Sequence, residues 1–326
     1  MTKIFDMHIH ILRDAHHGQE VRNYLLADQP VPRHVATTGT VTETLEMMRS
    51  TGVDRANVVM FTWTGRYYRD GLYTLPDRGD LDAAEHELRS RVVGRLIDNN
   101  RWAEATTQTH PKLGWFCGID PVLMTEAQLL DELETRLAGT ATGVALMPQD
   151  LGIRCDDRRL WPVYDHCSRQ GTPVLIGLSG AGHRFGRPRQ LAPVLAAFPA
   201  LKVILSRLGD ESRFGGRTDD EVVMLARAFP GVHVDTSMRM ADVARGLVSP
   251  DAVVQHLRAV GADRVTYGSG YCFNELVRQP TNEDARGPQH RYPNTVRAVE
   301  TLLSLPLTST ELSLIASENF LRLTSR

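Results

Sequence analysis

Two histidines near the start of the chain have the spacing of a catalytic or metal-binding pair. His8 and His10 alternate with apolar residues in the run Phe5-Asp6-Met7-His8-Ile9-His10. In a β-strand successive side chains point to opposite faces, so this run would place Asp6, His8 and His10 on one face. Imidazole binds divalent metals and exchanges protons near neutral pH. The spacing therefore predicts a metal site or an acid/base site at the end of a first strand.

Eight short apolar runs alternate with amphipathic stretches, and this pattern is typical of βα units around a parallel sheet. Their nearly continuous hydrophobicity suits strands that are buried on both faces. The sequence predicts an α/β fold, a single (β/α)₈ TIM-type barrel over residues 1–326, with loop insertions on the C-terminal face. The expected strands are Lys3 to His8, Arg55 to Phe61, Leu113 to Ile119, Gly143 to Met147, Pro173 to Leu178, Lys202 to Leu208, Val232 to Thr236 and Arg264 to Gly268.

Helix starts and insertions support this architecture. Capping boxes are expected at Thr40, Thr125 and Thr308, and Ser249 followed by proline is a further helix start. Two insertions, residues 65–80 and 273–294, follow the second and eighth strands. In a barrel they would lie on the C-terminal face beside the active site, as lids, surface loops or a subunit interface.

Composition favours a protein that binds a small molecule. The 326 residues are 42% apolar, and 37 basic residues against 39 acidic ones give a net charge of −2, which predicts no affinity for nucleic acid or for a membrane surface. The four scattered cysteines, Cys117, Cys155, Cys167 and Cys272, form no metal or redox motif and are expected to be reduced thiols. We find no secretory or membrane-spanning segment and expect a cytoplasmic protein.

A series of motifs along almost the whole chain resembles one family, the amidohydrolase superfamily, and within it the branch similar to aminocarboxymuconate semialdehyde decarboxylase. The order and spacing of the motifs carry the resemblance more than any one of them does. The motifs are Asp6-Met7-His8-Ile9-His10, Gly52-Val53-Asp54-Arg55-Ala56, His110-Pro111, Gly118-Ile119-Asp120-Pro121, Gly143-Val144 with Pro148, Gly171-Thr172-Pro173, Phe198-Pro199-Ala200-Leu201, Gly261-Ala262-Asp263-Arg264, Gly268-Ser269 and Glu318-Asn319-Phe320-Leu321.

The resemblance implies a divalent metal that the first-strand histidines share with a histidine after strand five and an aspartate after strand eight, with another histidine after strand six. This chain has Gly177, Arg207 and Gly270 at those three positions. Glycine has no donor atom and arginine stays cationic, whereas a catalytic zinc ion needs three protein ligands. We therefore expect no metal, although His183 or Asp235 could complete a replacement zinc site with the histidine pair.

A metal-free enzyme is the first hypothesis, since the resemblance extends to lactonases of the superfamily that work without a metal. His8 or His10 would be the general acid/base, and Arg207 would bind a substrate carboxylate or stabilise an oxyanion. Asp235 would orient a histidine or pair with Arg207. Structural alternatives are a surface ion pair for Arg207 with Asp210 or Glu211, and helix capping for Asp235.

Four further residues are expected to line the substrate pocket: Trp63, His183, Tyr271 and Cys272. Trp63 follows the second strand and could be an aromatic wall for a ring, or plain packing. Tyr271 and Cys272 follow the eighth strand, and Cys272 would be a nucleophile only beside a base and positive charge.

The sequence leaves the reaction open. Hydrolysis of a lactone or amide, decarboxylation, and a biosynthetic lyase or cyclase step all suit a small carboxylated or cyclic substrate. One alternative is a catalytically inactive barrel that binds a ligand or a partner protein, and another is a metal-dependent hydrolase with replacement ligands. The resemblance also leads us to expect a homodimer.

Overall fold

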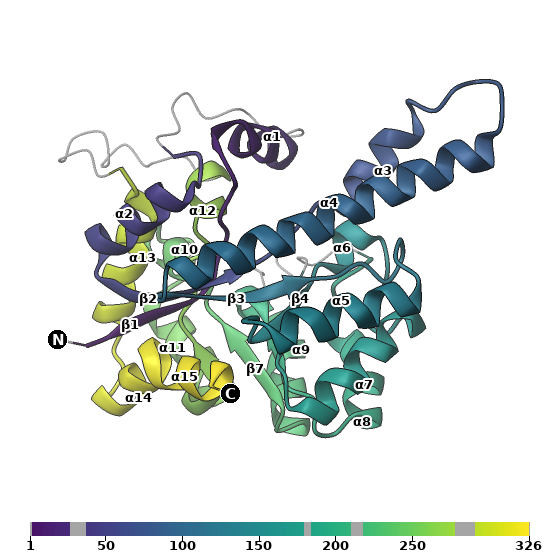
Figure 1. Ribbon diagram of the computed structural model, residues 1–326. Coiled ribbons are helices and arrows are strands. Elements are labelled where there is room, and N and C mark those ends of the chain that lie inside the picture. Colours follow the sequence, from purple (N-terminus) through teal and green to yellow (C-terminus); the bar gives the residue numbers. More distant parts are fainter. Residues whose placement is uncertain (1, 27–36, 179–183, 210–217, 278–290, 326) are drawn as a thin grey trace.

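Eight parallel strands form a nearly closed barrel in the computed structural model, which describes residues 2–26, 37–178, 184–209, 218–277 and 291–325 (Figure 1). Each strand pairs with the next in sequence order. Between the last strand and the first, Met7 N donates to Tyr267 O at 2.8 Å and Gly270 N donates to His8 O at 2.9 Å. The predicted barrel is confirmed. The strands are β1 (Ile4–Ile9), β2 (Val53–Val59), β3 (Leu113–Gly118), β4 (Gly143–Leu146), β5 (Val174–Ile176), β6 (Val203–Leu205), β7 (Val232–Asp235) and β8 (Val265–Thr266).

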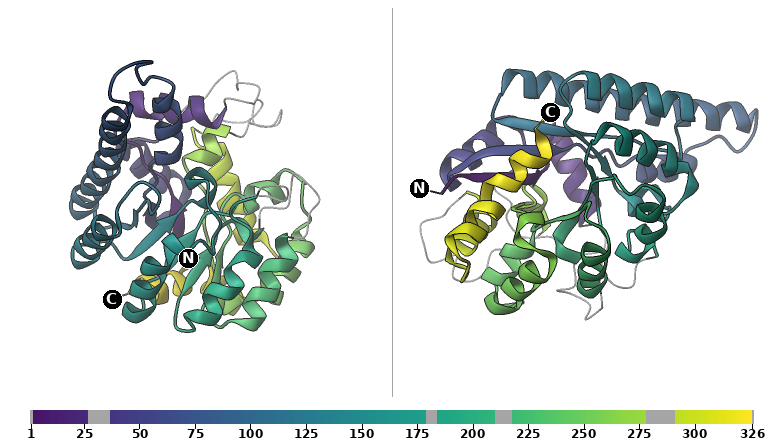
Figure 2. Two further views of the ribbon diagram at one scale, coloured as in Figure 1. Left: turned by 90° about the vertical axis from the view of Figure 1, so that its right-hand side faces the viewer. Right: turned by 90° about the horizontal axis from the view of Figure 1, so that it is seen from below.

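Helices surround the barrel (Figures 1 and 2). The capping boxes at Thr40, Thr125 and Thr308 and the Ser249 cap are present as expected. No described helix combines the length and apolar character that a bilayer span requires. The α-helices are α1 (Ala15–Leu25), α2 (Val41–Thr51), α3 (Thr64–Leu72), α4 (Leu81–Thr109), α5 (Glu126–Ala138), α6 (Pro148–Leu151), α7 (Trp161–Gln170), α8 (Ala192–Ala197), α9 (Thr218–Ala228), α10 (Arg239–Ala244), α11 (Pro250–Val260), α12 (Phe273–Val277), α13 (Pro293–Ser304), α14 (Ser309–Ser313) and α15 (Asn319–Thr324).

The first insertion is more regular than the loop we expected. It contains α3, which packs along the first half of α4, and Figures 1 and 2 show this pair projecting beyond the barrel. The two helices approach closely at Gly71, where a Cβ would lie 2.4 Å from a Leu88 methyl carbon. The second insertion contains α12, and its residues 278–290 lie outside the described residues.

The barrel interior is filled by apolar side chains from β1 to β6 and from the C-terminal helix. Residues of strands on opposite sides of a barrel meet only across its interior, so this cluster defines the inward face of each strand. The ring of Phe320 on α15 packs edge-on against Phe5, with 5.6 Å between ring centroids, and closes the N-terminal end. The cluster comprises Phe5, Met7, Val59, Phe116, Ala145, Leu175, Ile204, Phe320 and Leu323.

The regular alternation predicted for the first strand is wrong in one respect. Asp6 pairs with Ala56 and Ile9 with Val58, so three steps along β1 match two along β2, which is a β-bulge. Met7 packs in the barrel interior, whereas Ile9 packs in the cluster between barrel and helices. The inward face therefore changes parity after Met7. His8 and His10 point inward, and Asp6 is on the outer face rather than beside them.

The packing of Phe320 on α15 at the N-terminal end of the barrel gives a stability prediction. Phe320→Ala should lower the free energy of unfolding by about 3 kcal/mol, because it removes a buried ring and leaves a cavity at the closed end of the barrel. Denaturant unfolding measures the change. Leu321→Ala, at a side chain that is 39% exposed on the same helix, is the matched control and should change stability far less. Equal losses of unfolding free energy in the two variants would contradict a stabilising role for the buried Phe320 ring.

Candidate active site

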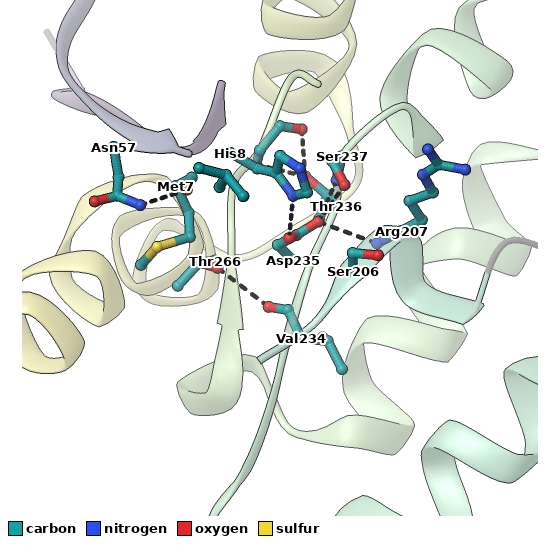
Figure 3. A network of polar contacts seen from close by, with 12 residues as sticks. Met7, His8, Asn57, Ser206, Arg207, Val234, Asp235, Thr236, Ser237 and Thr266 are labelled. Atoms are coloured by element: carbon teal, nitrogen blue, oxygen red, sulfur yellow. Dashed lines mark hydrogen bonds and ion pairs between the residues drawn. The ribbon is translucent and has the colours of Figure 1, made fainter. Parts of the chain in front are cut away.

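A buried carboxylate at the end of β7 organises the candidate site. Asp235 has no exposed surface, and its Oδ2 accepts a hydrogen bond from His8 Nδ1 at 2.8 Å. Its Oδ1 accepts from the backbone N–H groups of Ser237 at 2.8 Å and Arg207 at 3.0 Å, and from the Ser237 hydroxyl (Figure 3). Burial alone would raise the pKa of Asp235, but the charge of His8 and these donors hold it below its ordinary value. Asp235 is therefore an anion that fixes His8.

The two imidazoles face each other through their Nε2 atoms, which are 3.2 Å apart. His10 Nδ1 lies 2.9 Å from the carbonyl oxygen of Val59, which can only accept, so His10 carries its proton on Nδ1. Burial and then the charge of His8 lower the pKa of His10 well below its ordinary value, so its Nε2 is an acceptor. His8 already donates through Nδ1 to Asp235. The contact between the Nε2 atoms is a hydrogen bond only when His8 also carries a proton there, as imidazolium.

Aromatic rings pack beside His10 and extend to Trp63. The ring of Phe273 stacks on His10, with 3.9 Å between centroids and 14° between planes. Phe61 lies 6.5 Å from His10, and Trp63 lies 4.6 Å from Phe61 and 6.4 Å from Phe273. Trp63 is half-buried, and its indole N–H has no hydrogen-bond partner among the described residues. The surroundings of His10 are therefore largely aromatic.

The backbone at Arg207 adopts a left-handed conformation. Arg207 has φ 63° and ψ 19°, and Leu208 follows with φ 52°. Non-glycine residues adopt these angles at a cost, which the surrounding structure must offset. The turn presents the Arg207 N–H to Asp235, and Figure 3 shows the side chain extending away from that carboxylate. Asp235 thus bonds a histidine ring, and it meets Arg207 through the main chain and not through the guanidinium.

The other expected pocket residues lie in different surroundings. Tyr271 is fully buried, with its hydroxyl 3.1 Å from Thr37 Oγ1. Cys272 is also fully buried, and a Cβ at Gly39 would lie 2.4 Å from its Sγ. Burial raises the pKa of the Cys272 thiol, which disfavours the thiolate that a nucleophile requires. His183 lies outside the described residues, as do Asp210 and Glu211.

The structure also adds residues that the sequence did not single out. Ser237 donates twice to Asp235, the Val59 carbonyl fixes the tautomer of His10, and Phe273 supports the His10 ring. Ser237 could have been found, because a serine two residues after an aspartate often forms a local turn with it. Val59 acts through its backbone and Phe273 through a long-range contact, so neither carries a sequence signal.

The fold and the histidine pair at the C-terminal strand ends match one known family. The chain matches the amidohydrolase family over residues 5–319, and it therefore belongs to this family of enzymes. No curated protein matches the chain in sequence. Several solved structures share the fold over their whole length, at 12–18% sequence identity.

Three of these structures illustrate the relationship. An uncharacterised TIM-barrel protein from Bordetella bronchiseptica is 18% identical with a TM-score of 0.66, and the match covers 98% of each chain. The 5-carboxyvanillate decarboxylase of Sphingomonas paucimobilis is 15% identical with a TM-score of 0.61 over 99% of each chain. A dihydroxybenzoic acid decarboxylase from Polaromonas, solved with manganese and 2-nitroresorcinol, is 12% identical with a TM-score of 0.63, over 99% of this chain and 97% of that one.

The described residues do not fit a catalytic metal ion. Only His8 and His10 direct nitrogen atoms to a common point, and both oxygens of Asp235 are already occupied by donors. A Cβ at Gly177 would lie 2.3 Å from Met147 Sδ, and one at Gly270 would lie 2.9 Å from Met238 Cγ. Methionines thus fill the space where longer side chains would extend at these positions. Within the described residues no group of three or more His, Cys, Asp and Glu side chains could hold a metal.

This packing predicts how a metal site could be restored. Gly177→His alone should bind zinc poorly, because the new side chain collides with Met147. Gly177→His combined with Met147→Ala removes the collision and should raise zinc affinity about tenfold or more over Gly177→His, as a third imidazole joins His8 and His10. Isothermal titration with zinc measures this. Met147→Ala alone is the control, and equal affinity for all three variants would contradict the steric argument.

Proposed function

We propose that this protein is a metal-independent decarboxylase of a small carboxylated ring compound, with His8 and His10 as the acid/base pair. The observation that carries the proposal is the facing pair of Nε2 atoms, 3.2 Å apart, of which one belongs to a ring held by Asp235 and the other to a ring held by the Val59 carbonyl. Decarboxylation requires a proton delivered to carbon, and His8, oriented by the Asp235 anion, would deliver it as imidazolium. The named decarboxylases among the structural relatives support the same reaction class.

The proposed step balances in the following way. The bond between the ring carbon and its carboxylate breaks, the electron pair stays on the ring carbon, and carbon dioxide leaves. The ring carbon takes the proton from His8 Nε2, and solvent returns a proton to the pair before the next turnover. Asp235 keeps His8 oriented throughout and does not itself transfer the proton, as its oxygens are held by His8, Ser237 and Arg207.

Burial and the nearby rings favour this reaction over hydrolysis. His8 is 4% exposed and His10 is 5% exposed, so the proton is kept away from bulk water. Hydrolysis needs a base that activates water, but Asp235 is already bonded to His8, Ser237 and Arg207, and His10 Nε2 faces His8 Nε2 at 3.2 Å. The rings of Phe61, Trp63 and Phe273 would pack against a planar substrate.

Arg207 is proposed to anchor a carboxylate of the substrate. Its side chain is half-buried, and its backbone N–H bonds Asp235, which in turn bonds His8. The charge of Arg207 also helps to lower the pKa of His10, after burial and the charge of His8. A guanidinium binds a carboxylate through two parallel hydrogen bonds. The anchor would place the ring against the aromatic wall and its reacting carbon toward His8.

Turnover without metal tests the proposal. Chelator-treated protein of known metal content would be incubated in D₂O with 5-carboxyvanillate and 2,6-dihydroxybenzoate, the substrates named for two structural relatives. We expect carbon dioxide release and one deuterium at the carbon that lost it. His8→Asn should lower kcat/KM by about 100-fold to 10,000-fold, since it removes the acid, while His16→Asn, at an exposed histidine, should not change it.

Other outcomes would overturn the proposal in distinct ways. Activity that appears only after zinc or manganese is added would establish the second candidate, a metal-dependent reaction. That candidate is favoured by the facing Nε2 atoms and by the acceptors on both Nδ1 atoms, an arrangement that is also usual for metal-ligating histidines. Ligand binding without any turnover would indicate an inactive barrel.

The unusual backbone at Arg207 allows its side chain and its main chain to be tested separately. Arg207→Gly keeps the N–H that binds Asp235 and suits the positive φ, whereas Arg207→Ala keeps the strain. Both variants remove the guanidinium and should raise KM about tenfold or more, the cost of a charged hydrogen bond. Arg207→Gly should also be the more stable of the two in thermal unfolding. Unchanged KM in both variants would exclude the anchor.

A further inference from the structure

We propose that Asp6 is a positioning residue, which holds the β1 bulge so that His8 turns into the barrel and meets Asp235. Its Oδ1 accepts from His8 N at 3.1 Å and from Ser269 N at 2.9 Å. It does not face the substrate side, so its effect passes through the backbone. The kinetic consequence rests on the proposed function, but the structural consequence does not.

At the bulge, β1 changes which of its side chains face the barrel interior. Met7 points into the barrel with Phe5, and the next residue, His8, also points inward to reach Asp235. Two consecutive inward residues are not compatible with a regular strand. A bulge leaves one residue without its ladder partners, and an acceptor is needed for the amide that loses them. Asp6 Oδ1 is the acceptor for the His8 amide.

Asp6 also connects β1 to the end of β8. The same Oδ1 receives the Ser269 N–H, and the neighbouring Gly270 N–H donates to His8 O at 2.9 Å. At Gly268 a Cβ would lie 3.0 Å from His8 Cβ, so the absent side chain leaves room for His8. The backbone of His8 is thus held through both its N–H and its C=O groups, and Asp6 is the side chain that links the His8 amide to the amide of Ser269.

The burial of the Asp6 carboxyl is energetically unfavourable. Asp6 has no exposed surface, and its Oδ2 has no hydrogen-bond partner among the described residues. Burial raises the pKa of Asp6 to about 6, against the opposing effect of the Ser269 and His8 hydrogen bonds. A carboxyl used only for packing could be replaced by an apolar group at lower cost. The arrangement is explained if the position of Oδ1 is what the site requires.

Proton NMR of the His8 ring tests the proposal without turnover. The His8 Nδ1–H bonded to Asp235 should give a downfield, exchange-protected signal in protein labelled with ¹⁵N-histidine. Asp6→Asn keeps an acceptor at Oδ1 and should keep the signal. Asp6→Glu keeps the charge but displaces the acceptor by one methylene, and the signal should shift or disappear. With substrate, Asp6→Glu should lower kcat about 100-fold with little change in KM, as expected for a misplaced catalytic group.

Controls separate positioning from general stability. Tyr267→Phe removes a buried hydroxyl that has no partner among the described residues and that lies near Asp6, so it should leave the signal and kcat unchanged. The proposal is wrong if Asp6→Glu keeps the wild-type signal, or if Asp6→Asn loses it as completely as Asp6→Glu does. A retained signal in a protein without decarboxylase activity would support the positioning role and reject the proposed function instead.

Discussion

The burial of one negative charge determines most of the local structure at the candidate site. Donors around a buried carboxylate offset the cost of removing its charge from solvent. Asp235 obtains these donors from a histidine, a serine and two backbone amides. One of these amides is available only because Arg207 adopts positive φ, and the histidine only because β1 is bulged. Two departures from regular backbone geometry thus serve the same anion.

The burial of this charge also explains why the two neighbouring imidazoles have different hydrogen-bond partners. His8 has an anionic partner, whereas His10 has a neutral carbonyl and an apolar ring. Burial and the charge of His8 favour the neutral form of His10, whereas the Asp235 carboxylate fixes the orientation of the His8 ring. An acid/base pair needs two rings in different surroundings, and here the difference arises from the Asp235 side chain on β7, the Val59 carbonyl on β2 and the Phe273 ring after β8. The position at the C-terminal strand ends is where barrels of this kind place their chemistry.

The sequence predicts the fold and the histidine pair because both depend on local patterns. Apolar runs and capping boxes located all eight strands and four helix starts. Asp235 was singled out from its place at a strand end, and its contact with His8 agrees with the expected orienting role. The bulge was not predicted, since it depends on the register between β1 and β2 and not on the composition of β1. The main-chain role of Arg207 was missed for a similar reason, because the residue type gives no indication of positive φ.

Met147 and Met238 limit which side chains can be accommodated at two positions of this site. Each occupies space beside a glycine at which the resemblance places a metal ligand in related sequences. A single substitution that restores a ligand at position 177 meets a neighbour that has already moved in, and at position 270 it also meets a backbone with φ 75°. A longer side chain at either position therefore requires a second change at the neighbouring methionine. Packing of this kind couples the residue types at positions 177 and 270 to those at positions 147 and 238.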